Sequence, residues 1–193
     1  MSRLLVHRSR YEEVKLAVVA LAESLELGQG EAHAELTPVV SKDQQQQILA
    51  MIEQARSENA NILTGGSAPN LDGYFVLPTI IEATPNMTIA QKEVFGPVLV
   101  IMPFDDEAEA IAIANGTDFG LVSGVFGESI NQTLRVANRL ISGQVFINEW
   151  FAGGIETPFG GVGLSGFGRE KGQEAIYSYV QTRNIGIRLT HQA

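Results

Sequence analysis

The sequence predicts an α/β fold in which a mainly parallel sheet is flanked by helices. Short apolar runs of β-favouring residues alternate along the chain with stretches of helical periodicity, which is the pattern of βαβ units. The run Val98–Phe104 is apolar throughout, which is typical of a strand covered on both faces. A hydrophobic share of 45% and a charged share of 18% fit a globular protein with a sizeable core.

The first 104 residues are expected to hold most of this sheet. Four segments have the composition of strands or extended segments: Arg3–His7, Asn61–Gly66, Tyr74–Thr79 and Val98–Phe104. One helix is predicted over Tyr11–Leu25, and residues 26–40 interrupt the helical pattern. A second helix follows Ser41, which forms a capping box with Gln44. We interpret the glutamine run Gln44–Gln47 as a solvated face of that helix.

The alternation of helices and strands continues after the apolar run. Asp105 or Asp106 is expected to cap a helix that stops at Asn115, where a glycine follows. Three further elements are predicted in chain order: a strand at Ser123–Phe126, a helix at Ser129–Leu140 and a strand at Gln144–Asn148. Strands separated by helices of this length favour parallel pairing.

The last 40 residues have a different character. Seven glycines lie between Gly153 and Gly168, too many for a helix or a packed strand. A helix is predicted over Arg169–Tyr177, and Tyr179–Leu189 favours β structure but has little left to pair with locally. We therefore expect a domain over residues 1–178 and a pairing strand and tail over residues 179–193, and this strand has to be either covered or paired with another chain.

Composition and charge exclude several classes of partner. The net charge is −9 and the 13 basic residues are scattered, which argues against nucleic acid. No apolar run approaches the roughly 20 residues that span a bilayer, and the first residues do not have the pattern of a secretory signal. These features predict a cytoplasmic protein without a membrane anchor. The chain has no cysteine, so it has neither disulfides nor a thiol nucleophile.

Single motifs carry little functional information. The segment from Gly161 to Gly166 matches G-x-G-x-x-G, but neither a strand before it nor an acidic residue about 20 positions later accompanies it, so we interpret the match as coincidental. His7, His33 and His191 lack the spacing of metal ligands, and no metal site is expected. His7 is interpreted as a satisfied residue at the end of a strand.

Six segments, taken together and in order, resemble the aldehyde dehydrogenase superfamily. They are Leu36–Pro38, Gly73–Thr79, Gln91–Pro97, Ala114–Leu121, Gly143–Asn148 and Pro158–Glu170. They span nearly the whole chain, which makes chance agreement very unusual. The resemblance implies the catalytic-domain portion of an NAD(P)-dependent enzyme, with that family's α/β fold and a C-terminal oligomerisation strand.

The same resemblance implies cofactor-binding residues for NAD or NADP. Glu93 matches the carboxylate that hydrogen-bonds the nicotinamide ribose hydroxyls, and Phe95 matches the ring beside the nicotinamide. A carboxylate accepts hydrogen bonds from a diol, and an apolar ring can fix the plane of the hydride acceptor. Gln44 lies where some family members touch the cofactor from a helix.

Three aromatic residues are implied to contact substrate. Phe159 falls where the family lines its aldehyde tunnel, and Trp150 and Phe151 fall in the variable stretch that shapes substrate choice. The alternative for all three is ordinary core packing.

The resemblance assigns no catalytic residue to this chain. The family's reaction needs a cysteine thiolate that attacks the aldehyde, donors that stabilise the oxyanion, and a glutamate base. The matching cysteine would lie a few residues before Met1. Three hypotheses follow. The chain is part of an enzyme whose separate N-terminal half supplies these groups, or it is a non-catalytic pseudoenzyme or dimerisation module; the third, a small-molecule binder that uses the aromatic residues, has no distinct support in the sequence. The isolated chain is expected to be inactive, to bind NAD(P) weakly, and to form at least a homodimer.

Overall fold

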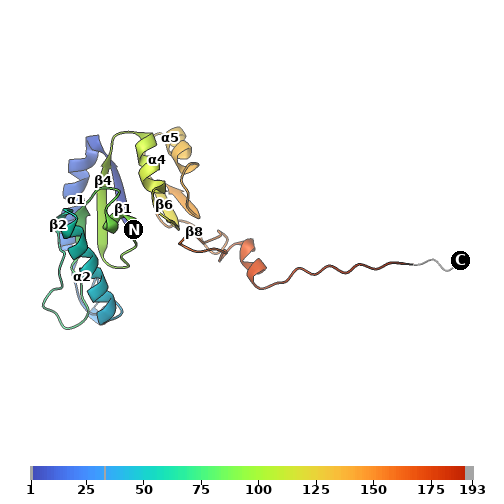
Figure 1. Cartoon of the computed structure of the whole chain (residues 1–193), viewed down its shortest axis with the longest axis horizontal. Helices are drawn as coiled ribbons and strands as arrows, with labels where there is room; N and C mark the ends of the chain where they lie inside the picture. The colour runs from blue at the N-terminus through green and yellow to red at the C-terminus, as the bar shows by residue number, and fades with distance from the viewer. Residues whose placement is uncertain (1, 33, 190–193) are drawn as a thin grey trace. The chain divides into compact units, whose positions relative to one another are not determined.

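The computed structural model describes residues 2–32 and 34–189 (Figure 1). The chain forms two compact units, the first ending at Thr117 and the second beginning at Asp118. This boundary is distinct from the predicted division at residue 178, which concerns the terminal strand and stays a prediction. His33 and His191 lie outside the described residues.

The first unit is built on a four-stranded sheet. Its strands are β1 (Arg3–His7), β2 (Asn61–Thr64), β3 (Thr79–Glu82) and β4 (Val98–Phe104), arranged in the order β1-β4-β3-β2. The pairs β1–β4 and β3–β4 are parallel, whereas β2 pairs with β3 antiparallel. The predicted mainly parallel sheet is therefore confirmed.

Two long helices cover opposite faces of this sheet (Figure 1). Neighbouring residues of β4 point to opposite faces, so Ile101 packs in the cluster that contains Tyr11, while Met102 packs in the cluster that contains Ile48. Tyr11 belongs to α1 (Tyr11–Ser24) and Ile48 to α2 (Lys42–Ser57). The apolar run of β4 is thus buried on both sides, as its composition predicts.

The predicted extended segment Tyr74–Thr79 is only partly a strand. Pairing begins at Thr79, whose backbone N–H donates to the carbonyl of Pro97 at 2.8 Å, and it continues to Glu82. The preceding residue, Pro78, has no N–H to donate to a ladder. The strand therefore starts later than the composition suggests.

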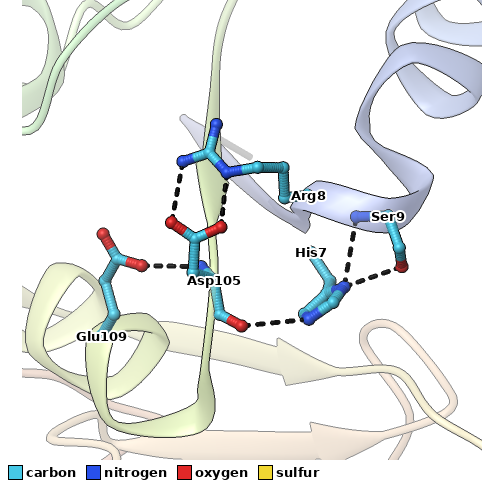
Figure 2. A network of polar contacts seen from close by, with 5 residues as sticks. All are labelled: His7, Arg8, Ser9, Asp105 and Glu109. Carbon is cyan, nitrogen blue, oxygen red and sulfur yellow. Dashed lines mark hydrogen bonds and ion pairs between the residues drawn. The ribbon is translucent and has the colours of Figure 1, made fainter.

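Polar contacts join the carboxyl ends of β1 and β4 (Figure 2). The guanidinium of Arg8 binds both carboxylate oxygens of Asp105, and this hydrogen bonding lowers the pKa of that carboxyl. The His7 ring lies 3.1 Å from the Asp105 carbonyl and 2.8 Å from the Ser9 hydroxyl. His7 is therefore a hydrogen-bonded residue at a strand end, as predicted.

The remaining helices of the first unit include α3 (Thr88–Gln91) and α4 (Glu107–Asn115). Of the two predicted caps for α4, it is Asp106 that accepts a hydrogen bond from the backbone of Glu109, at 2.9 Å. Two short 3-10 helices, η1 (Arg8–Arg10) and η2 (Gly30–Ala32), lie near the ends of α1. Among the described residues, no helix combines the length and the hydropathy needed to cross a membrane.

The second unit contains a parallel strand pair linked by a helix. Its elements are β5 (Phe119–Gly120), β6 (Val122–Val125), α5 (Ile130–Ala137), β7 (Gln144–Ile147), β8 (Val162–Gly163) and the 3-10 helix η3 (Gln173–Ser178). Strands β6 and β7 are parallel, and β5 pairs with β8 antiparallel. The α5 helix ends three residues earlier than predicted, although Ser129 caps its start as expected.

The predicted helix over Arg169–Tyr177 is wrong in position and type. Glu170 exchanges two backbone hydrogen bonds with Phe159, each 2.7 Å long, which holds it in an extended bridge. Lys171 and Gly172 then have positive φ values of 57° and 59°, which a right-handed helix cannot contain. Only η3 remains of the predicted helix.

The segment Tyr179–Leu189 forms no strand within this chain (Figure 1). Its first and last residues are 88% and 85% exposed. Its pairing with another chain stays a prediction.

Candidate functional site

A hollow of about 210 Å³ lies where α3 gives way to β4, beside the start of β1. Six residues line it: Ser2, Glu93, Val94, Phe95, Gly96 and Val98. The Ser2 carbonyl accepts a hydrogen bond from the backbone of Val100 at 3.0 Å, so β4 holds the beginning of β1 next to the loop. The E-x-F-G-P motif therefore borders this hollow with Glu93 and Phe95, the two residues that the resemblance predicts to bind the cofactor.

Phe95 has an unusual backbone conformation for an aromatic residue. Its φ is +50°, in the left-handed region, which costs an L residue roughly 1–2 kcal/mol. Its side chain is 77% exposed, so burial of the ring does not offset this cost. Such a conformation persists only when its surroundings determine it.

The flanking residues anchor this turn to α2. Val94 is buried in the same cluster as Ile48. Gly96 lies so close to Ile48 that an added Cβ would be 2.5 Å from its Cδ1 atom. A side chain at residue 96 would therefore push the loop away from the helix.

Gln44 also contacts this loop, through the loop's backbone. Its amide nitrogen donates to the carbonyl of Phe95 at 3.0 Å and to that of Val94 at 3.4 Å. Gln45 similarly donates to the carbonyl of Phe75 at 2.6 Å. The prediction that the whole glutamine run is a solvated face is therefore wrong for these two residues, and it holds for Gln46 and Gln47, which are exposed.

The short helix that leads into the loop is fixed at its start by Glu58, at the end of α2. Glu58 accepts hydrogen bonds from the backbone N–H and the hydroxyl of Thr88, at 2.8 and 2.6 Å. These bonds lower the pKa of the Glu58 carboxyl, since they favour its charged form. The two ends of helix α2 thus support the loop that contains Glu93: Gln44 binds the loop itself, and Glu58 binds the start of α3, which leads into it.

Glu93 itself is half-buried at the wall of the hollow. Within residues 2–32 and 34–189, no three His, Asp or Glu side chains gather closely enough to hold a metal ion. The carboxylate of Glu93 is chemically suited to accept hydrogen bonds from hydroxyl groups that enter the hollow.

The three predicted substrate residues come together in the second unit. The ring centroids of Trp150 and Phe151 are 5.8 Å apart, and those of Phe151 and Phe159 are 6.3 Å apart. Phe146, which the sequence did not single out, lies 6.3 Å from Phe151 in a stacked arrangement. We call Phe146, Trp150, Phe151 and Phe159 the aromatic group.

The aromatic group is not part of the buried core. Trp150 is 40% exposed and Phe151 is 57% exposed, while Phe159 is half-buried. The Nζ atom of Lys171 lies 5.9 Å from the ring centroid of Phe159, within the range of a cation–π contact. Trp150 and Phe151 are therefore accessible on the second unit, and the contact of these rings with substrate stays a prediction.

The glycine-rich match from Gly161 to Gly166 lacks the setting of a dinucleotide fingerprint. It contains the two-residue strand β8, and the next helical segment begins only at Gln173. A fingerprint loop instead joins a strand directly to the N-terminus of a helix. The structure supports the interpretation that this match is coincidental.

A family model described as "Aldehyde dehydrogenase family" matches residues 1–185. The chain belongs to the aldehyde dehydrogenase family. Betaine aldehyde dehydrogenase of Cereibacter sphaeroides is 38% identical over 188 residues, a match that covers 96% of this chain and 39% of the relative. Aldehyde dehydrogenase citD of Monascus ruber is 36% identical over 190 residues, covering 95% of this chain and 38% of the relative.

Solved aldehyde dehydrogenases share the fold. The NAD+ complex of the Bacillus cereus enzyme is 43% identical and superposes with a TM-score of 0.91, covering 93% of this chain and 37% of that one. Betaine aldehyde dehydrogenase of Staphylococcus aureus with NAD+ is 38% identical, with a TM-score of 0.89 and coverages of 92% and 37%. The chain spans well under half the length of the relatives and solved enzymes it matches.

The sequence missed two contributors to these sites. Ser2 lines the hollow although it belongs to none of the six segments that carry the family resemblance. Phe146 joins the aromatic group from β7. Its position in a predicted strand just ahead of Trp150 was the available signal.

Proposed function

We propose that this chain forms part of an NAD(P)-dependent aldehyde dehydrogenase, which oxidises an aldehyde to a carboxylic acid. The observation that carries the proposal is the hollow bordered by Glu93 and Phe95, in a chain of this family. NAD+ is the first cofactor to test, since the Bacillus cereus and Staphylococcus aureus structures hold it.

The residues of the hollow fit the nicotinamide riboside end of such a cofactor. The Glu93 carboxylate accepts hydrogen bonds from the ribose hydroxyls, and the exposed ring of Phe95 packs against the nicotinamide. When bound, the cofactor accepts the hydride that leaves the substrate. The chain's own contribution is to orient that end and to shield it from water.

The aromatic group fits an apolar aldehyde. Trp150, Phe151 and Phe159 present accessible rings that contact the substrate's carbon chain without competing for its carbonyl. Core packing alone is the less favoured role for Trp150 and Phe151, because these two rings are partly exposed.

The nucleophile has to come from outside these residues. The 193 residues contain no cysteine, so under this proposal a further segment or a separate chain supplies the thiolate. The resemblance implies that the general base comes from the same part. The alternative is a non-catalytic module that keeps the fold, and the same absence of cysteine favours it. Turnover by an enzyme completed with the missing part decides between the two.

Nicotinamide mononucleotide tests the cofactor end of the proposal in the chain itself. We expect weak binding, seen by NMR as saturable shifts of the Phe95 and Gly96 amides. Glu93→Gln should weaken it by roughly tenfold, because a charged acceptor is replaced by a neutral amide. Glu23→Gln, an exposed change on α1, is the matched control. An affinity that Glu93→Gln leaves unchanged, or chemical shift changes centred away from Phe95 and Gly96, would contradict the assignment of the hollow as the cofactor site.

A further inference from the structure

The amide of Gln44 is engaged with the backbone of the loop that the proposed function uses. We infer that Gln44 is a positioning residue: it holds the left-handed turn at Phe95 and thereby the direction of Glu93 and Phe95 at the hollow. The importance of this turn for cofactor binding rests on the proposed function. The stabilisation of the turn by Gln44 does not depend on that function.

The geometry of the donor explains the turn. One amide nitrogen reaches two successive carbonyls, those of Val94 at 3.4 Å and Phe95 at 3.0 Å. Successive carbonyls of an extended chain point in opposite directions, so they meet at one donor only where the chain turns. The φ of +50° at Phe95 makes that turn.

Glutamine has the chemistry that this contact needs. Carbonyl oxygens only accept hydrogen bonds, so the nitrogen of the Gln44 amide, and not its oxygen, has to face them. That nitrogen carries two hydrogens, one for each carbonyl. A side chain of the same length without a donor would leave both carbonyls without this partner.

The amide of Gln44 is carried by a well-anchored helix, α2. Gln44 lies in the first turn of α2, where its own backbone N–H donates to the Ser41 cap at 3.1 Å. One turn further along the helix, the fully buried Ile48 contacts Gly96. The helix therefore holds the loop around Phe95, by hydrogen bonds to the carbonyls of Val94 and Phe95 and by packing against Gly96.

The neighbouring glutamine provides an internal control. Gln45 makes an equivalent bond to a different loop, at the carbonyl of Phe75. A substitution at Gln45 therefore removes a similar hydrogen bond between α2 and a loop, and it leaves the contacts of the Phe95 turn unchanged. Gln47, which is exposed, controls for the loss of an amide from the same helix.

Backbone order parameters of the ligand-free chain, from 15N relaxation, test the holding of the turn. We expect values near roughly 0.85 at Phe95 and Gly96 in the unchanged chain, and below about 0.6 in Gln44→Met. Gln44→Lys, which keeps several donors, should retain most of the order. Gln45→Met should loosen Phe75 instead, and Gln47→Met should change neither loop.

Nicotinamide mononucleotide titrations of the same variants test the consequence for binding. We expect Gln44→Met to bind roughly tenfold more weakly and Gln44→Lys to recover most of that loss. Weaker binding by Gln44→Met with unchanged order at Phe95 would make Gln44 a direct ligand and overturn the inference.

Two further outcomes are separable. If the backbone order parameter of Phe95 is unchanged in Gln44→Met, Gln44 does not hold the turn, and the inference is refuted whatever the titration gives. If the unchanged chain does not bind the mononucleotide, the proposed cofactor site fails, and the order parameters still decide what Gln44 does. Thermal unfolding of each variant and the core amide resonances show that the comparison is made between folded proteins.

Discussion

At the scale of single residues, Phe95 combines an unfavourable backbone conformation with an exposed ring. Stability alone does not explain this choice, because glycine adopts the left-handed region without steric cost. We therefore propose that the ring serves binding, through contact with a ligand that enters the hollow. Backbone strain of this kind concentrates at binding sites.

Replacing Phe95 with glycine should separate folding from binding. We expect Phe95→Gly to unfold with a free energy equal to that of the unchanged chain or higher by up to about 1 kcal/mol, since relief of strain outweighs the added flexibility of the unfolded chain. Urea unfolding measures this difference. Phe95→Ala, which keeps a Cβ in the strained conformation, is the control and should show no gain.

A loss greater than about 1 kcal/mol in Phe95→Gly would mean that packing of the ring holds the loop. Mononucleotide binding should fall in both variants, because both lack the ring.

At the scale of the elements, α2 acts on the site through its two ends. Gln44 binds the loop from the first turn, and Glu58 binds the start of α3 from the last. The carboxylate form of Glu58 makes the bonds to Thr88, so folding depresses its pKa below the ordinary value of 4.5. Its contribution to stability is complete above that value and is lost as the pH falls through the lower pKa of the folded state.

Glu58→Gln should therefore make the melting temperature depend less on pH in the acidic range. We expect the melting temperature of the unchanged chain to approach that of the variant as the pH falls below about 4.5, because protonation removes the same charged acceptor. Scanning calorimetry across pH 3 to 7 checks this, with Glu23→Gln on the exposed side of α1 as the control. A difference in melting temperature between the unchanged chain and Glu58→Gln that stays constant across this pH range would show that the charge of Glu58 does not contribute to stability.

Local sequence signals predicted most of the elements. The caps at Ser41 and Ser129 and the apolar run of β4 lie where expected, because capping and two-sided burial depend on neighbouring residues. The helix at Arg169–Tyr177 was wrong because a distant partner, Phe159, holds Glu170 in a bridge. Propensity over a short window does not include such a contact.

The candidate site was predictable to a similar extent. The motif identified Glu93 and Phe95, and the structure places both at the hollow. The contact of Gln44 with residues 50 and 51 positions away was not predicted. The apolar stripe of α2, which includes Ile48 and Ile52, places Gln44 on the covered face of the helix, but it does not identify the loop that the amide meets.

At the scale of the whole molecule, the terminal segment is the clearest sign of a partner. Tyr179–Leu189 includes large apolar side chains that are exposed, among them Val180, Ile185 and Ile187. A β-favouring segment without a partner in its own chain is suited to pair with a second copy. We therefore propose that the chain forms at least a dimer.

Light scattering at micromolar concentration measures the mass of the assembly. We expect twice the 20.8 kDa of one chain, or more. A variant with Ile185→Asp and Ile187→Asp should shift the mass toward one chain, because buried unpaired charges oppose the pairing. The same change made at exposed Gln46 and Gln47 is the control, and a monomer mass for the unchanged chain contradicts the proposal.

The relatives and solved enzymes that the chain matches are more than twice its length, so the proposed chemistry is best measured in a chain completed to that length. The upstream portion of the Bacillus cereus enzyme, joined ahead of Ser2, is the part that the family resemblance expects to carry the cofactor domain and the nucleophilic cysteine. A matched fusion in which that cysteine is alanine controls for background reduction of NAD+.

The rate of NADH formation with a panel of aldehydes, measured for the isolated chain and for the two folded fusions, tests the central claim most directly. We expect turnover from the cysteine-containing fusion alone, with Glu93→Gln raising the KM for NAD+ about tenfold. Aldehyde oxidation by the isolated chain, or a folded cysteine-containing fusion that is inactive with every aldehyde, would contradict the claim.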